Sequence, residues 1–321
     1  MKPDSLKNLA DEADALLRVQ WQQWPEAAGH YVALSQCRER TVEVGGVPVR
    51  LQCNPERIRS TASKVDRRSV AQRPCFLCDA NRPAEQLSVP VAGRYQLLVN
   101  PYPIFPRHFT LPAVEHVPQL LRGRFGDMLQ LAAALPACMV FYNGARCGAS
   151  APDHMHFQAG NKGFVPIESQ WDTLLATQGE SRRWEGGVVY SRLTRWPVAM
   201  LAFEGDDAEA LCAFWERVEA LLPVPSGDAE PPVNMLCSFT GTSWRCWAVL
   251  RTRHRPWQYD AGGEAQRLVS PGAVDMAGVV ITPRETDFLS LSAAELADIY
   301  RQVADPSLLD VCLQQLKTRC R

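Results

Sequence analysis

The sequence lacks an excess of charge of either sign and lacks any long hydrophobic run. Its 34 lysines and arginines nearly cancel its 35 aspartates and glutamates, leaving a formal net charge of -1. This balance gives no global attraction to nucleic acid or to an anionic membrane, so neither is expected as a partner and any anion site must be local. No run approaches the roughly 18 apolar residues of a membrane span, and the acid-containing start, MKPDSLKNLADEADALL, does not resemble a signal peptide. We therefore expect a cytoplasmic protein.

The sequence also lacks a cysteine pattern that would indicate disulfides. The 11 cysteines are odd in number and scattered singly, except for Cys75 and Cys78 in the stretch CFLC. Buried thiols and one metal site explain this distribution better than a disulfide framework. The chain does have a large apolar fraction: 321 residues that are 46% hydrophobic can bury a large core, in one large domain or two ordinary ones.

Hydrophobic periodicity predicts an α+β fold. Helices are expected over residues 4–23, 117–135 and 208–222, and from Ser292 onward. Strands are expected in a hairpin over 41–52 and at 95–99, 108–111, 138–143, 195–205 and 278–283. Residues 53–83, rich in arginine, serine and proline and weakly periodic, predict a long ordered loop.

The second half of the chain loosely repeats the order of the first. Laying Asn143 on Asn234 aligns three polar residues with residues of the second half: His154 with Arg245, His156 with Trp247 and Gln158 with Val249. We interpret this as a duplicated unit whose second copy has lost its polar residues. The expected units are residues 1–190 and 191–321.

The stretch NGARCGASAPDHMHFQAG holds two of the six histidines. Side chains two apart on a β-strand share a face, so His154, His156 and Gln158 would point into one pocket while the residues between them enter the core. Alone, this pattern fits buried structural histidines equally well. The preceding Gly148 and Ser150 change the balance, because glycine backbone and hydroxyl donors can approach a phosphate closely.

The CFLC stretch predicts a metal site. Two thiolates three residues apart can bind one zinc ion from a tight turn, but a tetrahedral site needs two more ligands. His116 and His154 are the best candidates. The alternative, a redox pair, expects the motif to open a helix in a βαβ unit, whereas Cys75 and Cys78 follow a proline in a loop.

Three stretches in this order, CFLC, RHFTLPAVEH and FYNGARCGASAPDHMHFQ, resemble the histidine triad (HIT) superfamily. The similarity is to its transferase branch, which includes galactose-1-phosphate uridylyltransferase, diadenosine tetraphosphate phosphorylase and GDP-hexose phosphorylases. It spans residues 75–158. The resemblance implies a HIT-like antiparallel sheet with flanking helices, here duplicated with a degenerate second repeat.

The resemblance also implies roles for single residues. His156 would be the nucleophile that forms a covalent nucleotidyl intermediate, and Gln158 would hold a non-bridging oxygen of the phosphate under attack. Asn143, Gly148 and Ser150 would line the phosphate path.

The resemblance further implies a structural zinc ion, Zn2+, bound by Cys75, Cys78, His116 and His154. His108 matches a histidine near the nucleotide ribose or phosphate, although a structural role is equally compatible with the sequence.

Elementary chemistry supports these roles. An imidazole attacks phosphorus only when neutral, so the other ring nitrogen of His156 must keep its proton and donate it, we expect to a backbone carbonyl. An amide at position 158 can hold a phosphate but offers no proton to a leaving group. Since the hydrolase branch has a third histidine there, Gln158 favours transfer to a phosphate acceptor over transfer to water.

Two groups of basic residues are candidate anion sites. Among the arginines of NPERIRSTASKVDRR, which are Arg57, Arg59, Arg67 and Arg68, we favour Arg57 and Arg59 for binding the base or phosphates. The second cluster, Arg251, Arg253, His254 and Arg255, fits an acceptor-phosphate site or a solvated strand end, and the sequence leaves its role open.

The sequence therefore predicts a nucleotidyltransferase or phosphorylase. It would move a nucleoside monophosphate from a nucleoside diphosphate sugar or a dinucleoside polyphosphate, through His156, to phosphate or a sugar phosphate. The alternatives are a zinc-containing nucleotide sensor without activity and a nucleotidyl hydrolase. Both a monomer and a homodimer are compatible with the sequence.

Overall fold

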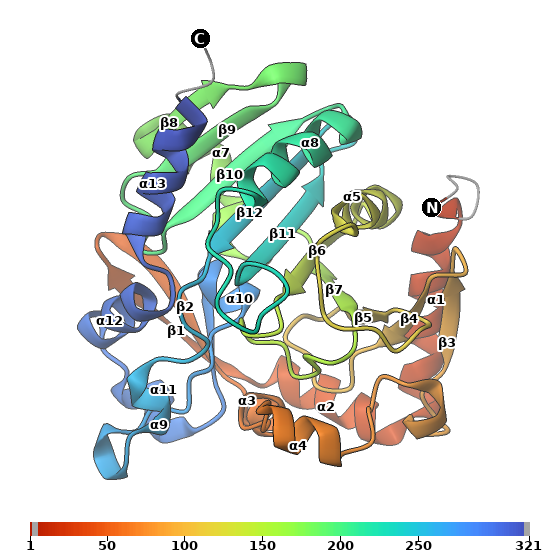
Figure 1. Ribbon diagram of the computed structural model, residues 1–321. Coiled ribbons are helices and arrows are strands. Elements are labelled where there is room, and N and C mark those ends of the chain that lie inside the picture. The colour runs from red at the N-terminus through yellow and green to blue at the C-terminus, as the bar shows by residue number, and fades with distance from the viewer. Residues whose placement is uncertain (2–5, 318–321) are drawn as a thin grey trace.

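A ten-stranded antiparallel sheet organises the structure, a computed structural model that describes residues 1 and 6–317 (Figure 1). Five neighbouring strands come from the first half of the chain, in the spatial order β3 (Ser88–Val91), β4 (Tyr95–Val99), β5 (His108–Pro112), β7 (His156–Asn161) and β6 (Cys138–Asn143). The next five come from the second half, in the order β11 (Val233–Phe239), β12 (Trp244–Leu250), β10 (Met200–Gly205), β9 (Val189–Leu193) and β8 (Gly179–Arg183).

The two halves of this sheet have the same internal order. In each, three strands follow one another along the chain, a helix comes next, and the last two strands lie nearest the centre. The helix is α5 (Phe125–Ala134) in the first half and α8 (Ala208–Glu219) in the second. The α+β class and the repeated arrangement predicted from the sequence are therefore confirmed.

The halves meet where β6 pairs with β11 at the middle of the sheet. The pairing is antiparallel, and its register places Asn143 directly opposite Asn234. The two asparagines that the sequence comparison aligned are thus neighbours across the junction. The proposed unit boundary at residue 190 lies within β9, and the division into units 1–190 and 191–321 stays a prediction.

One face of the large sheet packs against helices. This core contains buried residues of α5 and α8, of α1 (Leu9–Gln23) and of α13 (Pro306–Lys317), together with every second residue of the strands. Helix α1 contacts β3 and β4, as its place in Figure 1 shows. Its amphipathic pattern was predicted from the sequence.

The opposite face packs against a second, three-stranded sheet of β1 (Arg38–Val44), β2 (Val47–Cys53) and β13 (Val279–Thr282). The predicted hairpin forms β1 and β2, and β13 pairs with β2 in parallel. The remaining helices in and around this layer are α6 (Pro166–Ser169), α7 (Trp171–Gln178), α10 (Ala273–Met276), α11 (Glu285–Ser290) and α12 (Ala293–Val303).

Two expectations about local structure were wrong, and one helix was not expected. The helix expected over 117–135 begins only at Phe125, because residues 117–124 follow an irregular path fixed by tertiary contacts: the Leu121 N–H donates to the Glu230 carboxylate at 2.8 Å. The expected loop over 53–83 contains the short helices η2 (Pro55–Arg57), α3 (Ile58–Thr61), α4 (Arg67–Gln72) and η3 (Asp79–Asn81). A helix that the sequence analysis did not predict, α2 (Pro25–Ser35), starts directly at a proline, which is favoured at a first helical position.

Among the described residues, no helix is long and apolar enough to span a membrane. Three further short elements complete the chain: η4 (Glu185–Gly187), α9 (Trp257–Asp260) and η5 (Gly263–Ala265).

Candidate active site

The site is built on β7, between β5 and β6 in the first half of the large sheet. Register places His156 opposite Pro112, and Gln158 opposite both Thr110 and Phe141. His156 and Gln158 point to one face, while the alternate residues of β7 enter the helix-side core, as predicted. The prediction fails for His154, because β7 begins only at His156 and the His154 ring turns away from the pocket toward two cysteines.

His156 has its two ring nitrogens in different environments. Nδ1 lies 2.8 Å from the carbonyl oxygen of His154, an acceptor only, so Nδ1 carries the proton and donates it. Nε2 is left with its lone pair toward the cavity. Burial lowers the pKa of His156 to about 4, so the imidazole is neutral at pH 7. The predicted backbone acceptor for Nδ1–H is therefore present.

Gln158 is oriented by His108. The Ile104 N–H donates to His108 Nδ1 at 3.1 Å, so the proton of this neutral ring sits on Nε2 and is donated to Gln158 Oε1 at 3.0 Å. The Gln158 amide therefore turns its NH2 group into the cavity. Burial, reinforced by the charge of Arg57, lowers the pKa of His108 to about 3. His108 itself is fully buried and does not line the cavity, so the structure places it behind Gln158 rather than in the pocket.

A residue that the sequence gave no reason to select joins the two sides of the site. Gln119 donates from Nε2 to the backbone oxygens of Asn143 (2.8 Å) and His156 (3.1 Å), and its Oε1 accepts from the His156 N–H at 2.7 Å. This buried amide fixes the end of β6 against the start of β7. No recurring pattern marks Gln119 in the sequence, because its partners are backbone groups far away in the chain.

His156 and Gln158 open onto a cavity of about 480 Å³, a volume ordinary for a small-molecule site. All but one of the predicted substrate-binding residues line it: Asn143, Gly148, Ser150, Arg57 and Arg59. The exception is His108.

Four arginines line this cavity: Arg57, Arg59, Arg73 and Arg255. Arg57 donates to the Tyr102 carbonyl at 2.7 Å and to the Ser60 hydroxyl at 2.9 Å, and burial lowers its pKa to about 10, so it stays charged at pH 7. Arg59 is exposed at the rim and donates to the Tyr102 hydroxyl at 2.9 Å. Arg73, which the sequence analysis missed, donates to the Ser150 carbonyl at 2.5 Å and so lies beside the loop between β6 and β7.

The second basic cluster is divided by the fold. Arg251 is buried and only 1% exposed, so a solvated strand end is wrong for this residue. His254 and Arg255 line the cavity, and Arg253 is exposed. Arg255 stacks over the Tyr259 ring at 3.9 Å and donates to the Ser63 carbonyl at 2.9 Å. Burial, followed by the charge of Arg255, lowers the pKa of His254 to about 3.

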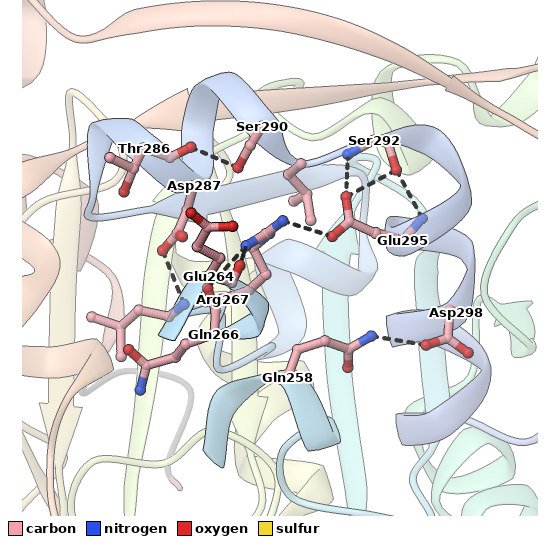
Figure 2. Close-up of polar contacts among 12 residues, drawn as sticks. Gln258, Glu264, Gln266, Arg267, Thr286, Asp287, Ser290, Ser292, Glu295 and Asp298 are labelled. Carbon is pink, nitrogen blue, oxygen red and sulfur yellow. Dashed lines mark hydrogen bonds and ion pairs between the residues drawn. The ribbon is translucent and has the colours of Figure 1, made fainter. Parts of the chain in front are cut away.

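Ser270, Gly272 and Ala273 also line the cavity. The segment just before them in the chain, residues 258–268, has polar contacts with α11 and α12 (Figure 2). Arg267 pairs with Glu295 at 2.9 Å and donates to the Glu264 carbonyl at 2.7 Å. Three further bonds tie the same segment to α11 and α12: Leu268 N–H to Asp287, Gln258 to Asp298, and Gln302 to Gln258.

The four predicted metal ligands come together next to this cavity. Their donor atoms, one each from Cys75, Cys78, His116 and His154, all lie within 4.8 Å of one another. Cys75 Sγ is 3.2 Å from His154 Nδ1, and Cys78 Sγ is 3.1 Å from His116 Nδ1.

The outer ring nitrogens of both histidines have partners of their own. His154 Nε2 donates to the Ala113 carbonyl at 2.8 Å, and His116 Nε2 lies 3.4 Å from an Asp153 oxygen. Such partners leave each Nδ1 free to bind a metal ion, an arrangement typical of metal-binding histidines. The cluster could therefore hold a metal.

Comparison with known proteins agrees with this architecture. Residues 16–161 match the family described as "Domain of unknown function (DUF4922)", and residues 174–321 match "GDPGP1-like, C-terminal domain". No curated protein matches the chain in sequence. Among solved structures, yeast Ap4A phosphorylase Apa2 superposes with a TM-score of 0.59 at 16% identity, covering 88% of this chain and 97% of that one. Its complex with Ap4A gives 0.56 at 15% identity, covering 90% and 98%.

The chain has the fold of this phosphorylase. This confirms the resemblance that the three sequence stretches indicated. In the part of the chain that the structure describes, the polar cavity lies on the sheet face of the first half. The same face of the second half is filled by apolar side chains, among them Leu236, Trp247 and Val249, which pack under β1 and β2.

One glycine of the loop between β6 and β7 is required by its surroundings. Gly148 has φ +96°, and a Cβ there would lie 2.9 Å from the Gly272 Cα. Gly241 has a similar φ of +102° but nothing within 4 Å of a Cβ.

We expect Gly241→Ala to lower the free energy of unfolding by roughly 1–2 kcal/mol, because alanine disfavours a left-handed backbone conformation. Gly148→Ala should lower it clearly more, because the new Cβ also clashes with the backbone of Gly272. Urea unfolding of both variants measures the difference. Equal losses would contradict the close approach of the two loops.

Proposed function

We propose that the protein is a nucleotidyltransferase that moves a nucleoside monophosphate through a covalent intermediate on His156. The observation that carries this proposal is a buried, neutral imidazole whose Nδ1–H is bonded to a carbonyl and whose Nε2 lone pair faces a cavity lined by arginines. A protein that only binds nucleotides does not need such a nucleophile. The observation therefore favours catalysis over the sensor function that the sequence left open.

In the first step, Nε2 of His156 attacks the α-phosphorus of the donor. An N–P bond forms, the P–O bond to the leaving group breaks, and the leaving phosphate departs with the bonding electrons. The imidazole now carries a positive charge, which the Nδ1–H bond to the His154 carbonyl stabilises. The inward NH2 group of Gln158 would hold a non-bridging oxygen as charge develops on it.

In the second step, a phosphate oxygen of the acceptor attacks the same phosphorus and the P–N bond breaks, which regenerates neutral His156. Gln158, which faces the cavity beside His156, is an amide and has no proton to give to a leaving group. Anionic phosphates need no proton to leave, whereas hydrolysis gains from proton transfers. The site therefore supports transfer between phosphates over transfer to water.

The donor we propose is a dinucleoside polyphosphate or a nucleoside diphosphate sugar. One protein of similar fold is an Ap4A phosphorylase, solved with AMP and with Ap4A. A second, open hollow of about 1710 Å³ adjoins the cavity and shares Ser63, Val65, His254 and Arg255 with it. We assign the departing group and the acceptor, phosphate or a sugar phosphate, to this side.

We propose zinc for the metal cluster. Two cysteine thiolates and two imidazoles are a donor set that zinc favours, and with all four positions filled its contribution would be structural. The cysteine loop packs on the phosphate loop: Cys75 and Leu77 form a small core with Ala151. Holding Cys75 and His154 together would therefore stabilise the loop before His156.

The covalent step predicts a trappable adduct. Incubation with a labelled donor should give an acid-labile, base-stable label on the protein, because a phosphoramidate forms. The label should be lost in His156→Ala and kept in His30→Ala, a histidine that does not line the cavity. Mass spectrometry after rapid quenching measures the adduct. A label that persists in His156→Ala would contradict the role of His156 as the nucleophile.

The zinc proposal predicts about one zinc per chain in purified protein. Cys75→Ser should lose the metal and melt at a lower temperature, because metal binding contributes to folding. Cys212→Ser is the matched control, since Cys212 is half-buried on α8, away from the cluster. Elemental analysis and thermal melting measure both, and a metal-free protein of unchanged melting temperature would refute the proposal.

The choice of transfer over hydrolysis predicts that turnover depends on an acceptor. With donor alone the enzyme should stop after one equivalent of adduct, and added phosphate or sugar phosphate should start steady turnover. Chromatography of nucleotides measures both phases. Equal steady rates with and without acceptor would show a hydrolase instead.

A further inference from the structure

Two donors bond to the same oxygen atom of the Asn143 side chain. Its Oδ1 accepts from the Ala273 N–H at 2.8 Å and from Asn234 Nδ2 at 2.8 Å. Nδ2 of Asn143 has no acceptor in the part of the chain that the structure describes, and Asn143 lines the cavity. The amide therefore offers its two N–H donors to whatever fills the cavity.

The direction of this amide is fixed by groups that can only donate. A backbone N–H and a guanidinium have no acceptor capacity, so the atoms they face must be oxygens. Arg251 Nη1 lies 2.6 Å from Asn234 Oδ1, which turns Asn234 Nδ2 toward Asn143 Oδ1 and toward the Cys147 carbonyl at 2.6 Å. Arg251, Asn234 and Asn143 thus form a directional chain of hydrogen bonds.

Arg251 is itself immobile. Its guanidinium is buried and donates to four backbone carbonyls, those of Val303, Pro271, Arg253 and His254, at 2.8–3.0 Å. No carboxylate pairs with it in the described structure. Burying a charge destabilises the fold unless each of its donors has an acceptor. The acceptors around Arg251 therefore fix its orientation, and through it that of Asn234.

We propose that Asn234 and Arg251, both from the second half of the chain, are positioning residues that hold the Asn143 NH2 group toward the phosphate of the substrate. The proposal rests on the nucleotidyl-transfer function above. It gives the second half, which has lost its own polar pocket, a part in the chemistry of the first. A reversed Asn143 amide would turn a carbonyl oxygen toward an anion and would leave the Ala273 N–H facing an NH2 group.

The decisive variant is Asn234→Asp, which still accepts from Arg251 but cannot donate to Asn143. We expect Asn143 to turn over and donate to the new carboxylate, and kcat/KM for nucleotidyl transfer to fall about 10–100-fold, the effect of one hydrogen bond to a charged group. Ser238→Ala, also on β11 but bonded to Glu168, is the control for a general disturbance of the strand.

A double-mutant cycle separates positioning from stability. If Asn234 acts through Asn143, Asn234→Asp should cost no further activity and no further AMP affinity once Asn143→Ala is present. Melting temperatures of all variants show any loss of folding. Losses that simply add would overturn the relay.

The two proposals fail differently. A wild-type protein that transfers nucleotides while the cycle is additive refutes the relay alone. A wild-type protein that neither transfers nor binds AMP refutes both.

Discussion

The antiparallel pairing of β6 with β11 is the interaction on which the rest of this structure depends. It joins two five-stranded halves into one sheet, and it sets Asn143 beside Asn234 at the edge of the face that carries His156 and Gln158. The loop that follows β6 then runs against the wall at Gly272, with no room for a side chain at Gly148. The cavity is thus a product of the junction, and neither half encloses it alone.

A second constraint is the neutrality of the buried polar groups. His108, His156 and His254 all have lowered pKa values, chiefly through burial, so the positive charge lining the cavity is that of its arginines. Each neutral group has its donor and acceptor sides set by a backbone contact, as with the Ile104 N–H behind His108. A site of this kind is preorganised for an anion, since its dipoles need not reorient when the substrate arrives.

The sequence predicted what local patterns can encode. Alternation placed His156 and Gln158 on one face, spacing and resemblance together assembled the four metal ligands, and the repeated order of elements anticipated the paired halves. It missed groups whose roles depend on distant partners. Gln119 acts on backbone atoms, Arg73 on the Ser150 carbonyl, and Arg251 looked like a solvated basic residue because its acceptors are carbonyls that no side-chain pattern reveals.

The small second sheet has a consequence for how the chain reaches this state. Its central strand, β2, is flanked by β1 and by β13, and the pairing of Val279 with Arg50 joins residues near opposite ends of the sequence. During synthesis the hairpin emerges early, but the strand that completes its sheet emerges almost last. Until then the apolar side chains of Val49 and Leu51 lack part of their cover. Long-range pairing of this kind is slow to form. The nascent protein therefore exposes an apolar, aggregation-prone surface for most of its translation.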